Sequence, residues 1–306
     1  MARCFVTLEL PGPALDRLRS AHEVTVWPEP RAVTDAELAA GAADAEGLLS
    51  MLTDRIDAAF LDGCPQLTAI ANCAVGYDNI DVAAARERGI RVGNTPDVLT
   101  GATADLTLAL LLAIARGIPS AAESVRLGEW QAWSPTGYLG HEVHGATLGI
   151  IGMGRIGRAV AQRAAGFEME ILHTGKGGVP LLQLLARSDF VSVHCPLTPE
   201  TRHLIDAAAL AEMRPTAFLI NTARGPIVDQ TALRHALIEG QIAGAALDVT
   251  DPEPLPPYDP LFKAPNLLVV PHIGSATHAT REAMASAAVD NLLAALAGEP
   301  MPYQVS

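Results

Sequence analysis

The chain is poor in basic residues. It has 21 Lys and Arg against 34 Asp and Glu, a formal net charge of −13 over 306 residues, and its only lysines are Lys176 and Lys263. Nucleic acids and anionic membranes are bound by basic patches, so this balance argues against both as partners. An anionic ligand would have to be bound by local positive groups, because the field of the whole molecule repels it.

Cysteines are also few and widely spaced. The four of them, Cys4, Cys64, Cys73 and Cys195, include no C-x-x-C pair, so we expect no disulfide framework and no metal. The N-terminal string MARCFVTLEL has no signal-peptide pattern, and the most apolar run, residues 106–115, is too short to span a bilayer. A reducing, cytoplasmic location fits this cysteine usage best, and no membrane partner is expected.

Hydrophobic residues, by contrast, make up 49% of the chain, enough for the cores of two domains. Strand-length apolar runs alternate with helical segments, for example the helices expected at 34–41, with Glu37 three residues after Thr34 as in a capping box, and at 54–61. This alternation predicts an α/β fold of two doubly wound parallel-sheet domains. We expect residues 1–97 plus 287–306 to form one discontinuous domain and residues 98–286 the other.

The most informative local pattern is ATLGIIGMGRIGR, residues 146–158, in which a buried strand runs into G-x-G-x-x-G and a helix. In such a turn the first glycine permits the bend, the second lets the backbone approach a pyrophosphate, and the third lets helix and strand pack closely. The motif therefore predicts a dinucleotide cofactor. Contacts to it are expected from Gly152, Gly154, Arg155, Ile156 and Gly157.

Four further segments stand out, most of them at the end of a predicted strand. They are VGYDNID (75–81), NTARG (221–225), LDVTDPEPLP (247–256) and PHIGSATH (271–278). Ligands of open α/β sheets bind at the carboxyl ends of the strands. One crevice could therefore gather Val75, Gly76, Arg224, Glu253 and His272.

On the basis of these strings, the chain resembles the D-2-hydroxyacid dehydrogenase family, and within it the glyoxylate/hydroxypyruvate reductases. The resemblance extends over nearly the whole length of the chain. It implies a flavodoxin-like substrate domain and a Rossmann cofactor domain, with a cleft between them. It also implies an NAD(P)-dependent oxidoreductase acting on the CH–OH group of donors. The expected reaction is hydride transfer to a small anionic 2-oxo acid, from glyoxylate to glycolate and from hydroxypyruvate to D-glycerate.

The resemblance also implies the roles of individual residues. His272 would be the general acid that protonates the keto oxygen, Glu253 would orient its other ring nitrogen, and Arg224 would hold the 2-oxo acid with its planar guanidinium. The backbone N–H groups of Val75 and Gly76 would bind the carboxylate. Further substrate contacts are expected from Met51, Leu52, Trp133 and Ser275, and further cofactor contacts from Thr103, Gly175, Lys176, Pro196, Thr222, Asp248 and Gly274. Trp133 resembles a position that closes the site of a neighbouring subunit, which implies a homodimer.

The choice between NAD(H) and NADP(H) depends on the residues that follow the second strand of the cofactor domain. NAD-specific sites place Asp or Glu at the end of the second strand, but here the strand at 169–173 is followed by Thr174-Gly175-Lys176. A cation attracts a 2′-phosphate that an acid would repel, so NADP(H) is favoured. NAD(H) stays possible if backbone contacts replace the acid. The segment after Gly178 is shorter than in relatives, which leaves the adenine side more open.

Two alternatives stay open. The same fold could act on another substrate, such as D-lactate, D-3-phosphoglycerate, phosphite or a bulkier 2-oxo acid; formate is disfavoured because formate enzymes pair His with Gln, where this chain has Glu253. A nucleotide-sensing binding protein would need no acid–base pair, so Arg224, Glu253 and His272 count against it. His194 and His278 are interpreted as packing or capping residues.

Overall fold

The computed structural model describes residues 1–305, and it divides into two compact units. Unit 1 consists of Met1–Leu99 and the chain from Ala276 onward, and unit 2 is Thr100–Ser275. The boundaries expected at residues 97 and 286 differ from these. The second falls inside α11 (His278–Leu296), which is one continuous helix packed on the sheet of unit 1.

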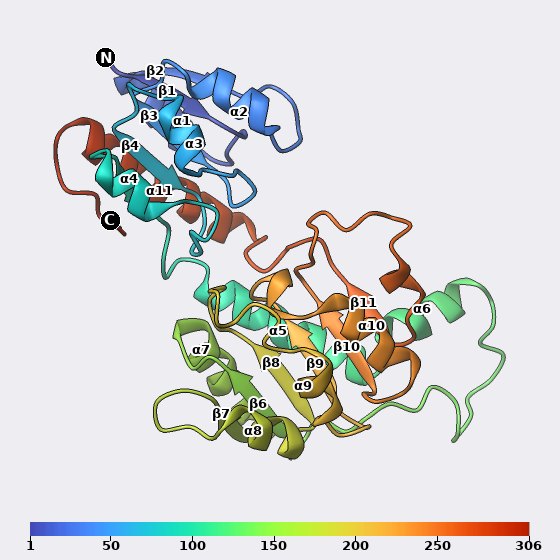
Figure 1. Ribbon diagram of the computed structural model, residues 1–306. Helices are drawn as coiled ribbons and strands as arrows, with labels where there is room; N and C mark the ends of the chain where they lie inside the picture. Colours follow the sequence, from blue (N-terminus) through green and yellow to red (C-terminus); the bar gives the residue numbers. More distant parts are fainter. Residues whose placement is uncertain (306) are drawn as a thin grey trace. The chain divides into compact units, whose positions relative to one another are not determined.

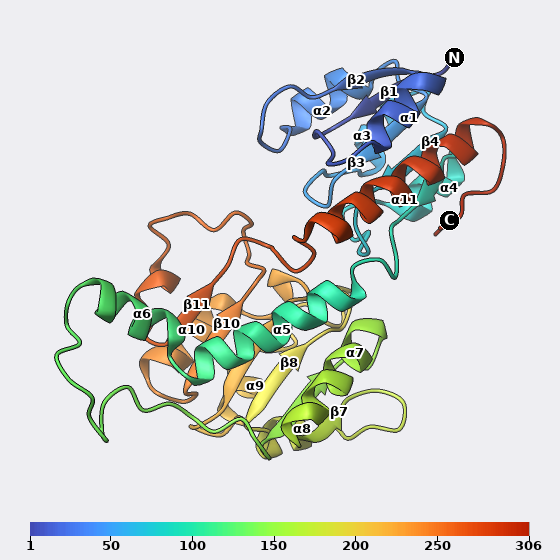
Figure 2. The same cartoon turned by 180° about the vertical axis from the view of Figure 1, so that it is seen from behind.

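Unit 1 is built on a five-stranded parallel sheet in the order β2-β1-β3-β4-β5. Its strands are β1 (Arg3–Val6), β2 (Glu23–Val26), β3 (Gly47–Ser50), β4 (Ala69–Asn72) and β5 (Arg91–Gly93). Helices α1 (Ala14–Ala21) and α11 pack side by side on one face (Figure 2). Helices α2 (Asp35–Ala42), α3 (Ala58–Asp62) and α4 (Val82–Glu87) enclose a core on the other face.

Unit 2 is built on a six-stranded parallel sheet in the order β11-β10-β9-β8-β6-β7 (Figure 1). Its strands are β6 (Thr147–Ile151), β7 (Glu170–His173), β8 (Phe190–Val193), β9 (Phe218–Asn221), β10 (Gly244–Leu247) and β11 (Leu267–Val269). The α-helices are α5 (Thr100–Ala115), α6 (Ile118–Arg126), α7 (Arg155–Ala164), α8 (Leu181–Arg187), α9 (Ala207–Ala211) and α10 (Gln230–Ile238). Short 3₁₀ turns are η1 (Ala165–Phe167), η2 (Gly225–Ile227) and η3 (Pro260–Lys263). The predicted pair of doubly wound parallel sheets is confirmed.

The strands of unit 2 are covered on both faces, which explains why their sequences are apolar without alternation. Successive residues of β9 enter opposite cores: Phe218 and Ile220 pack with α5 and α7, whereas Leu219 packs with α8, α9 and α10. No single helix within residues 1–305 is long and apolar enough to cross a membrane; α5 and α6 pass that test only together, as a pair bent by 62°. Half of the α5 residues are buried, including Leu108 and Leu111 in the core of unit 2.

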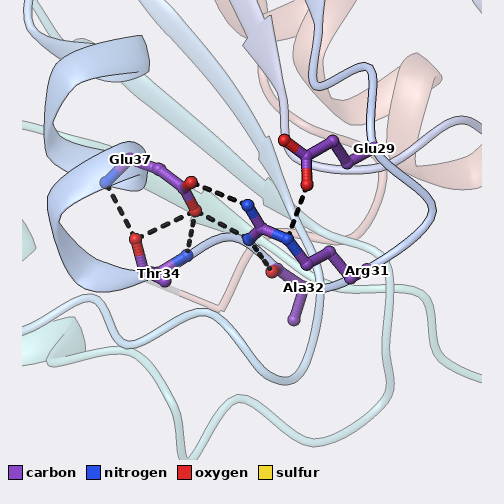
Figure 3. Close-up of polar contacts among 5 residues, drawn as sticks. All are labelled: Glu29, Arg31, Ala32, Thr34 and Glu37. Atoms are coloured by element: carbon purple, nitrogen blue, oxygen red, sulfur yellow. Dashed lines mark hydrogen bonds and ion pairs between the residues drawn. The ribbon is translucent and has the colours of Figure 1, made fainter.

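Two helix starts in unit 1 show how polar side chains set the boundaries. At α2 the predicted capping box is present: Thr34 accepts from the N–H of Glu37, and the Glu37 carboxylate accepts from the N–H of Thr34 (Figure 3). The helix expected at 54–61 begins only at Ala58, because Asp57 is its N-cap and accepts from Phe60. Asp54 instead turns inward, where it accepts from the N–H of Met51 at 2.7 Å.

Candidate active site

The carboxyl edge of the unit 2 sheet carries a predicted site residue after every strand. Because all six strands are parallel, the segments that follow them leave the sheet at the same edge. In the order of the chain, these residues are Gly152 after β6, Gly175 after β7, Pro196 after β8, Thr222 and Arg224 after β9, Asp248 and Glu253 after β10, and His272 after β11. The three proposed catalytic side chains thus follow three adjacent strands.

The glycine loop between β6 and α7 has the shape that a dinucleotide phosphate requires. Gly152 has φ of +99°, and a Cβ there would lie 2.6 Å from the backbone nitrogen of Cys195. A Cβ on Gly157 would lie 2.3 Å from the carbonyl oxygen of Gly152, so helix and turn are in backbone contact. Gly154 has open space around it and begins α7 without a side-chain cap. The first-turn N–H groups of this ten-residue helix therefore lack a side-chain acceptor at the N-cap and fit a pyrophosphate.

The predicted acid–base pair is assembled. The ring nitrogen Nδ1 of His272 lies 2.5 Å from Oε1 of Glu253, although the two residues are nineteen positions apart. Their side chains retain 22% and 28% of their exposure, so both are shielded and still reachable by a small molecule. His272 has φ of +51°, an uncommon backbone conformation for a residue other than glycine, and its N–H donates to the carbonyl of Asp248 at 2.9 Å.

Asp248 anchors the loop that carries His272. Its buried carboxylate accepts from the N–H groups of Ile273 at 2.7 Å and Gly274 at 2.8 Å. Burial raises the pKa of Asp248, while these two donors and the nearby His272 act in the opposite direction. A Cβ on Gly274 would lie 3.0 Å from Oδ2 of Asp248 and 3.5 Å from Thr103, so the predicted residues Asp248, Gly274 and Thr103 are close neighbours.

Arg224 belongs to a turn held by a residue that the sequence reasoning missed. The side chain of Asn221 accepts from the N–H of Ala223 at 3.0 Å and donates to the carbonyl of Arg224 at 2.9 Å. A Cβ on Gly225 would lie 2.0 Å from the carbonyl oxygen of Thr250, so this turn packs directly on the segment that follows β10. The Asn that opens the NTARG string was the available signal, because Asn side chains favour such local turns.

The turn after β7 is the place where NAD-specific sites carry an acid for the ribose hydroxyls. The hydroxyl of Thr174 accepts from the N–H of Gly152 at 3.2 Å, which joins this turn to the glycine loop. Gly175, at the position where an acid was expected for NAD, has φ of +97°, a conformation that side chains rarely adopt. The N–H of Gly178 donates to the carbonyl of Gly175, which closes the turn, and Lys176 is exposed on it.

The remaining predicted residues lie in separate places. In unit 1, Met51 and Leu52 follow β3, and Val75 and Gly76 follow the adjacent strand β4; all four are half-buried. Trp133 is 81% exposed in the segment after α6. Ser275 and Thr222 are buried in unit 2, where the Thr222 hydroxyl lies 3.0 Å from that of Thr107, a further residue that the motifs did not reveal.

The two histidines interpreted as structural are easily placed. Nε2 of His194 lies 2.8 Å from the hydroxyl of Ser192, and burial lowers the pKa of His194 to about 4. The prediction for His278 is wrong: it is exposed at the first position of α11, and the cap of that helix is Thr277, which accepts from the N–H of Thr280. Among residues 1–305, no group of three or more His, Cys, Asp or Glu side chains could hold a metal ion.

A histidine–carboxylate pair at the same edge of a doubly wound sheet as a glycine loop is typical of nicotinamide-dependent oxidoreductases. Residues 108–274 match the family model for the NAD-binding domain of D-isomer specific 2-hydroxyacid dehydrogenases. A glyoxylate reductase from Korarchaeum cryptofilum is 48% identical over 317 residues, which cover 99% of this chain and 96% of the relative.

Solved structures agree. The crystal structure of a Thermus thermophilus protein is 51% identical, with a TM-score of 0.94, and covers 99% of this chain and 100% of its own. An NADPH-dependent glyoxylate/hydroxypyruvate reductase from Sinorhizobium meliloti, in complex with NADP and malonate, is 34% identical with a TM-score of 0.87, over 100% and 97% of the chains. The chain belongs to the D-isomer specific 2-hydroxyacid dehydrogenase family, in its glyoxylate reductase subgroup. It is accordingly an NAD(P)-dependent oxidoreductase acting on CH–OH groups.

Proposed function

We propose that this protein is an NADPH-dependent reductase that converts glyoxylate to glycolate and hydroxypyruvate to D-glycerate. The observation that carries the proposal is the His272–Glu253 pair, 2.5 Å apart at the carboxyl edge that also bears Arg224. The glyoxylate reductases among its relatives and the Sinorhizobium meliloti enzyme support reduction of small 2-oxo acids.

In this proposal the chain's own residues supply the proton to the keto oxygen and stabilise the negative charge that develops on it. When bound, the nicotinamide supplies a hydride to the keto carbon. His272 donates a proton from Nε2 to the keto oxygen, because Nδ1 is engaged with Glu253. Glu253 fixes the ring orientation, and Arg224 stabilises the negative charge that develops on the oxygen before the proton arrives.

Substrate selection follows from anion binding. The guanidinium of Arg224 offers a planar pair of donors to the carboxylate and keto oxygens, a geometry that lysine lacks. The N–H groups of Val75 and Gly76 bind the carboxylate, and Ser275 adds a hydroxyl contact. Met51 and Leu52 wall the pocket and limit the size of the substrate's third substituent.

Several observations support NADP(H) over NAD(H). No acid occurs at residues 174–179, and Gly175 has a φ that an Asp or Glu would adopt only with strain. Lys176 is the one cation on this turn and is placed to attract a 2′-phosphate. The other contacts proposed for the cofactor come from the glycine loop with Arg155 and Ile156, and from Pro196, Thr222, Asp248, Gly274 and Thr103. The Sinorhizobium meliloti relative binds NADP.

A homodimer completes the proposal. Helix α6 buries none of its residues, and the segment after it extends away from the body of unit 2 (Figure 1). Large apolar side chains are exposed along both: Ile118, Val125, Leu127, Trp130, Trp133, Tyr138 and Leu139. An apolar surface of this extent is typical of a protein interface, which light scattering of the purified protein would test. Through it, Trp133 would reach the substrate site of the partner subunit.

A direct assay tests the function. Oxidation of NADPH and of NADH, measured side by side with glyoxylate, hydroxypyruvate and pyruvate, should be fastest with NADPH and one of the first two acids. Faster turnover of pyruvate, or of a bulkier 2-oxo acid, would instead favour the second substrate class. The nucleotide-sensing alternative has lost its support, because the acid–base pair that it does not need is assembled.

A further inference from the structure

We infer that Asn94 is a positioning residue for substrate binding, because its side-chain amide orients the N–H groups that receive the carboxylate. Asn94 follows β5, the strand next to β4, and its side chain is buried in unit 1. The inference rests on the proposed function, in which Val75 and Gly76 bind the carboxylate through their backbone.

Hydrogen bonds to two carbonyls fix the peptide planes of this loop. The carbonyl of Ala74 accepts from the N–H of Thr95 at 2.8 Å, and the carbonyl of Val75 accepts from Nδ2 of Asn94 at 2.8 Å. Both carbonyls therefore face the Asn94–Thr95 segment. In a trans peptide the N–H points opposite to the C=O of the same plane, so the N–H groups of Val75 and Gly76 are both turned away from that segment. Two consecutive N–H groups presented together form an anion-binding concavity.

Within residues 1–305, neither of these two N–H groups donates to another protein group. A second amide extends the arrangement, because Nδ2 of Asn72 donates to the carbonyl of Gly76 at 2.9 Å. Three successive carbonyls of the loop, at residues 74, 75 and 76, are thus held by hydrogen bonds from neighbouring segments. The orientation of the loop's donors is therefore built in before any ligand arrives.

Asn94 is itself held by the last helix of the chain. Its carbonyl accepts from Nδ2 of Asn291, a fully buried residue of α11, at 2.8 Å. Oδ1 of Asn291 accepts from the N–H of Tyr303 at 2.9 Å, and the N–H of Asn94 donates to the carbonyl of Tyr303. A Cβ on Gly93 would lie 2.8 Å from the Asn291 amide, so glycine is needed for this approach. A buried amide is costly unless its hydrogen bonds are satisfied. Here the amide of Asn291 binds the carbonyl of Asn94, and the amide of Asn94 binds the carbonyl of Val75.

The test compares Asn94→Ala with the wild type and with Asn266→Ala. Asn266 makes the same kind of bond, from Nδ2 to the carbonyl of Ala243 at 3.0 Å, but it lies before β11 in unit 2, at the opposite end of the strand from His272. Asn94→Ala should raise the KM for glyoxylate and the inhibition constant of oxamate, a carboxylate analogue, about ten- to hundredfold, the range for a lost hydrogen bond to a charged group. Since the carboxylate is bound equally before and during hydride transfer, kcat should stay within about threefold, and the Kd for NADPH should not change.

Asn94→Asp adds a readout that a purely structural role would not produce. The ionised carboxylate repels both the Val75 carbonyl and the substrate, whereas the protonated form can again donate to that carbonyl. The ratio of its KM to that of the wild type should therefore fall as the pH is lowered from about 8 to about 5, where Asp takes up a proton. This variant decides the question if Asn94→Ala does not fold.

The inference is overturned by a folded Asn94→Ala whose KM and oxamate inhibition match the wild type, or by an Asn94→Asp ratio that does not respond to pH. In either case a wild type that reduces glyoxylate leaves the proposed function intact. A wild type that reduces no 2-oxo acid overturns both.

Discussion

The two units share a strand order, yet they use it differently. In each sheet the first strand lies between the second and the third, so each has a point where the chain direction across the sheet reverses. Such a point is where open α/β sheets bind ligands. In unit 2 the first strand, β6, is followed by the glycine loop, in which Gly154 has open space around it at the N-terminus of α7. In unit 1 the residue after β1 is Thr7, fully buried, whose hydroxyl donates to the inward-facing Asp54 at 2.5 Å. The same topology is thus open for a cofactor in one unit and filled in the other.

A second difference concerns the kind of group presented. Unit 2 offers charged side chains, Arg224, Glu253 and His272, on three adjacent strand ends. Unit 1 offers backbone N–H groups, which neutral amides orient. Substitutions in unit 2 should therefore act on turnover and on charge recognition, whereas substitutions in unit 1 should act on binding or stability alone.

The largest effect is expected at His272. His272→Ala removes the proposed general acid, and kcat should fall by about 10²–10⁴. The Kd for NADPH, measured by fluorescence titration, should not change, because the glycine loop is untouched. Glu253→Gln keeps a hydrogen-bond acceptor beside Nδ1 and should lose less. Normal turnover by purified His272→Ala would reject the mechanism.

A smaller effect is expected from Arg224→Lys. The charge remains, but the planar fork is lost, and kcat/KM for glyoxylate should fall by about 10²-fold, mainly through KM. Steady-state kinetics with Arg224→Ala as the reference for complete removal separates the charge from the geometry. A lysine variant with wild-type KM would show that charge alone binds the substrate.

A smaller effect than that of Arg224→Lys is expected on cofactor preference, from a substitution of Lys176. Lys176→Glu places an acid on the turn after β7, and the ratio of NADPH to NADH affinity should fall about tenfold at low salt, with a smaller change at high salt. Lys263→Glu is the matched control, since it removes the only other lysine, on η3. Equal effects of the two variants would mean that only net charge matters.

The smallest effect is expected in unit 1, at the start of α2. Thr34→Ala removes the N-cap and should lower the free energy of unfolding by about 1 kcal/mol without changing kinetics. The guanidinium of Arg31, with the N–H of Thr34, lowers the pKa of Glu37 to about 2 (Figure 3). This lowered pKa means that Glu37 contributes stability above the ordinary pKa of Glu, near 4.3, and that the contribution is lost as the pH falls toward 2.

The hydroxyl of Thr34 also donates to the Glu37 carboxylate at 2.9 Å and helps to lower its pKa, and Thr34→Ala removes this bond. Urea unfolding at about pH 7 and about pH 3 should therefore show the difference in unfolding free energy between wild type and Thr34→Ala narrowing in acid. Ser20→Ala, which removes an exposed bond to the carbonyl of Arg17, should show no such change with pH. A gap that is independent of pH would mean that Glu37 does not take part in the cap.

The sequence predicted the strands and the glycine loop, because apolar patterning and motifs are local, whereas the acid–base pair was expected from the family resemblance. It placed the start of α3 too early, since whether Asp54 or Asp57 caps the helix depends on the buried partner that Asp54 finds in Thr7. It did not assign a role to Asn94 or Asn291, which meet across 197 positions. The return of the last helix to the first domain was expected, but the boundary expected at residue 286 divides α11, all of which belongs to unit 1.

By itself, then, the amino-acid order determined which segments become strands and helices, and which side chains could carry charge and protons. Tertiary structure alone decided which carbonyls each buried amide reaches, as at Val75, and which glycines keep open space around them, as at Gly154. The physical reason is that burial makes every unmatched polar group costly, so the partners of such groups are chosen by three-dimensional proximity, which a linear pattern does not contain.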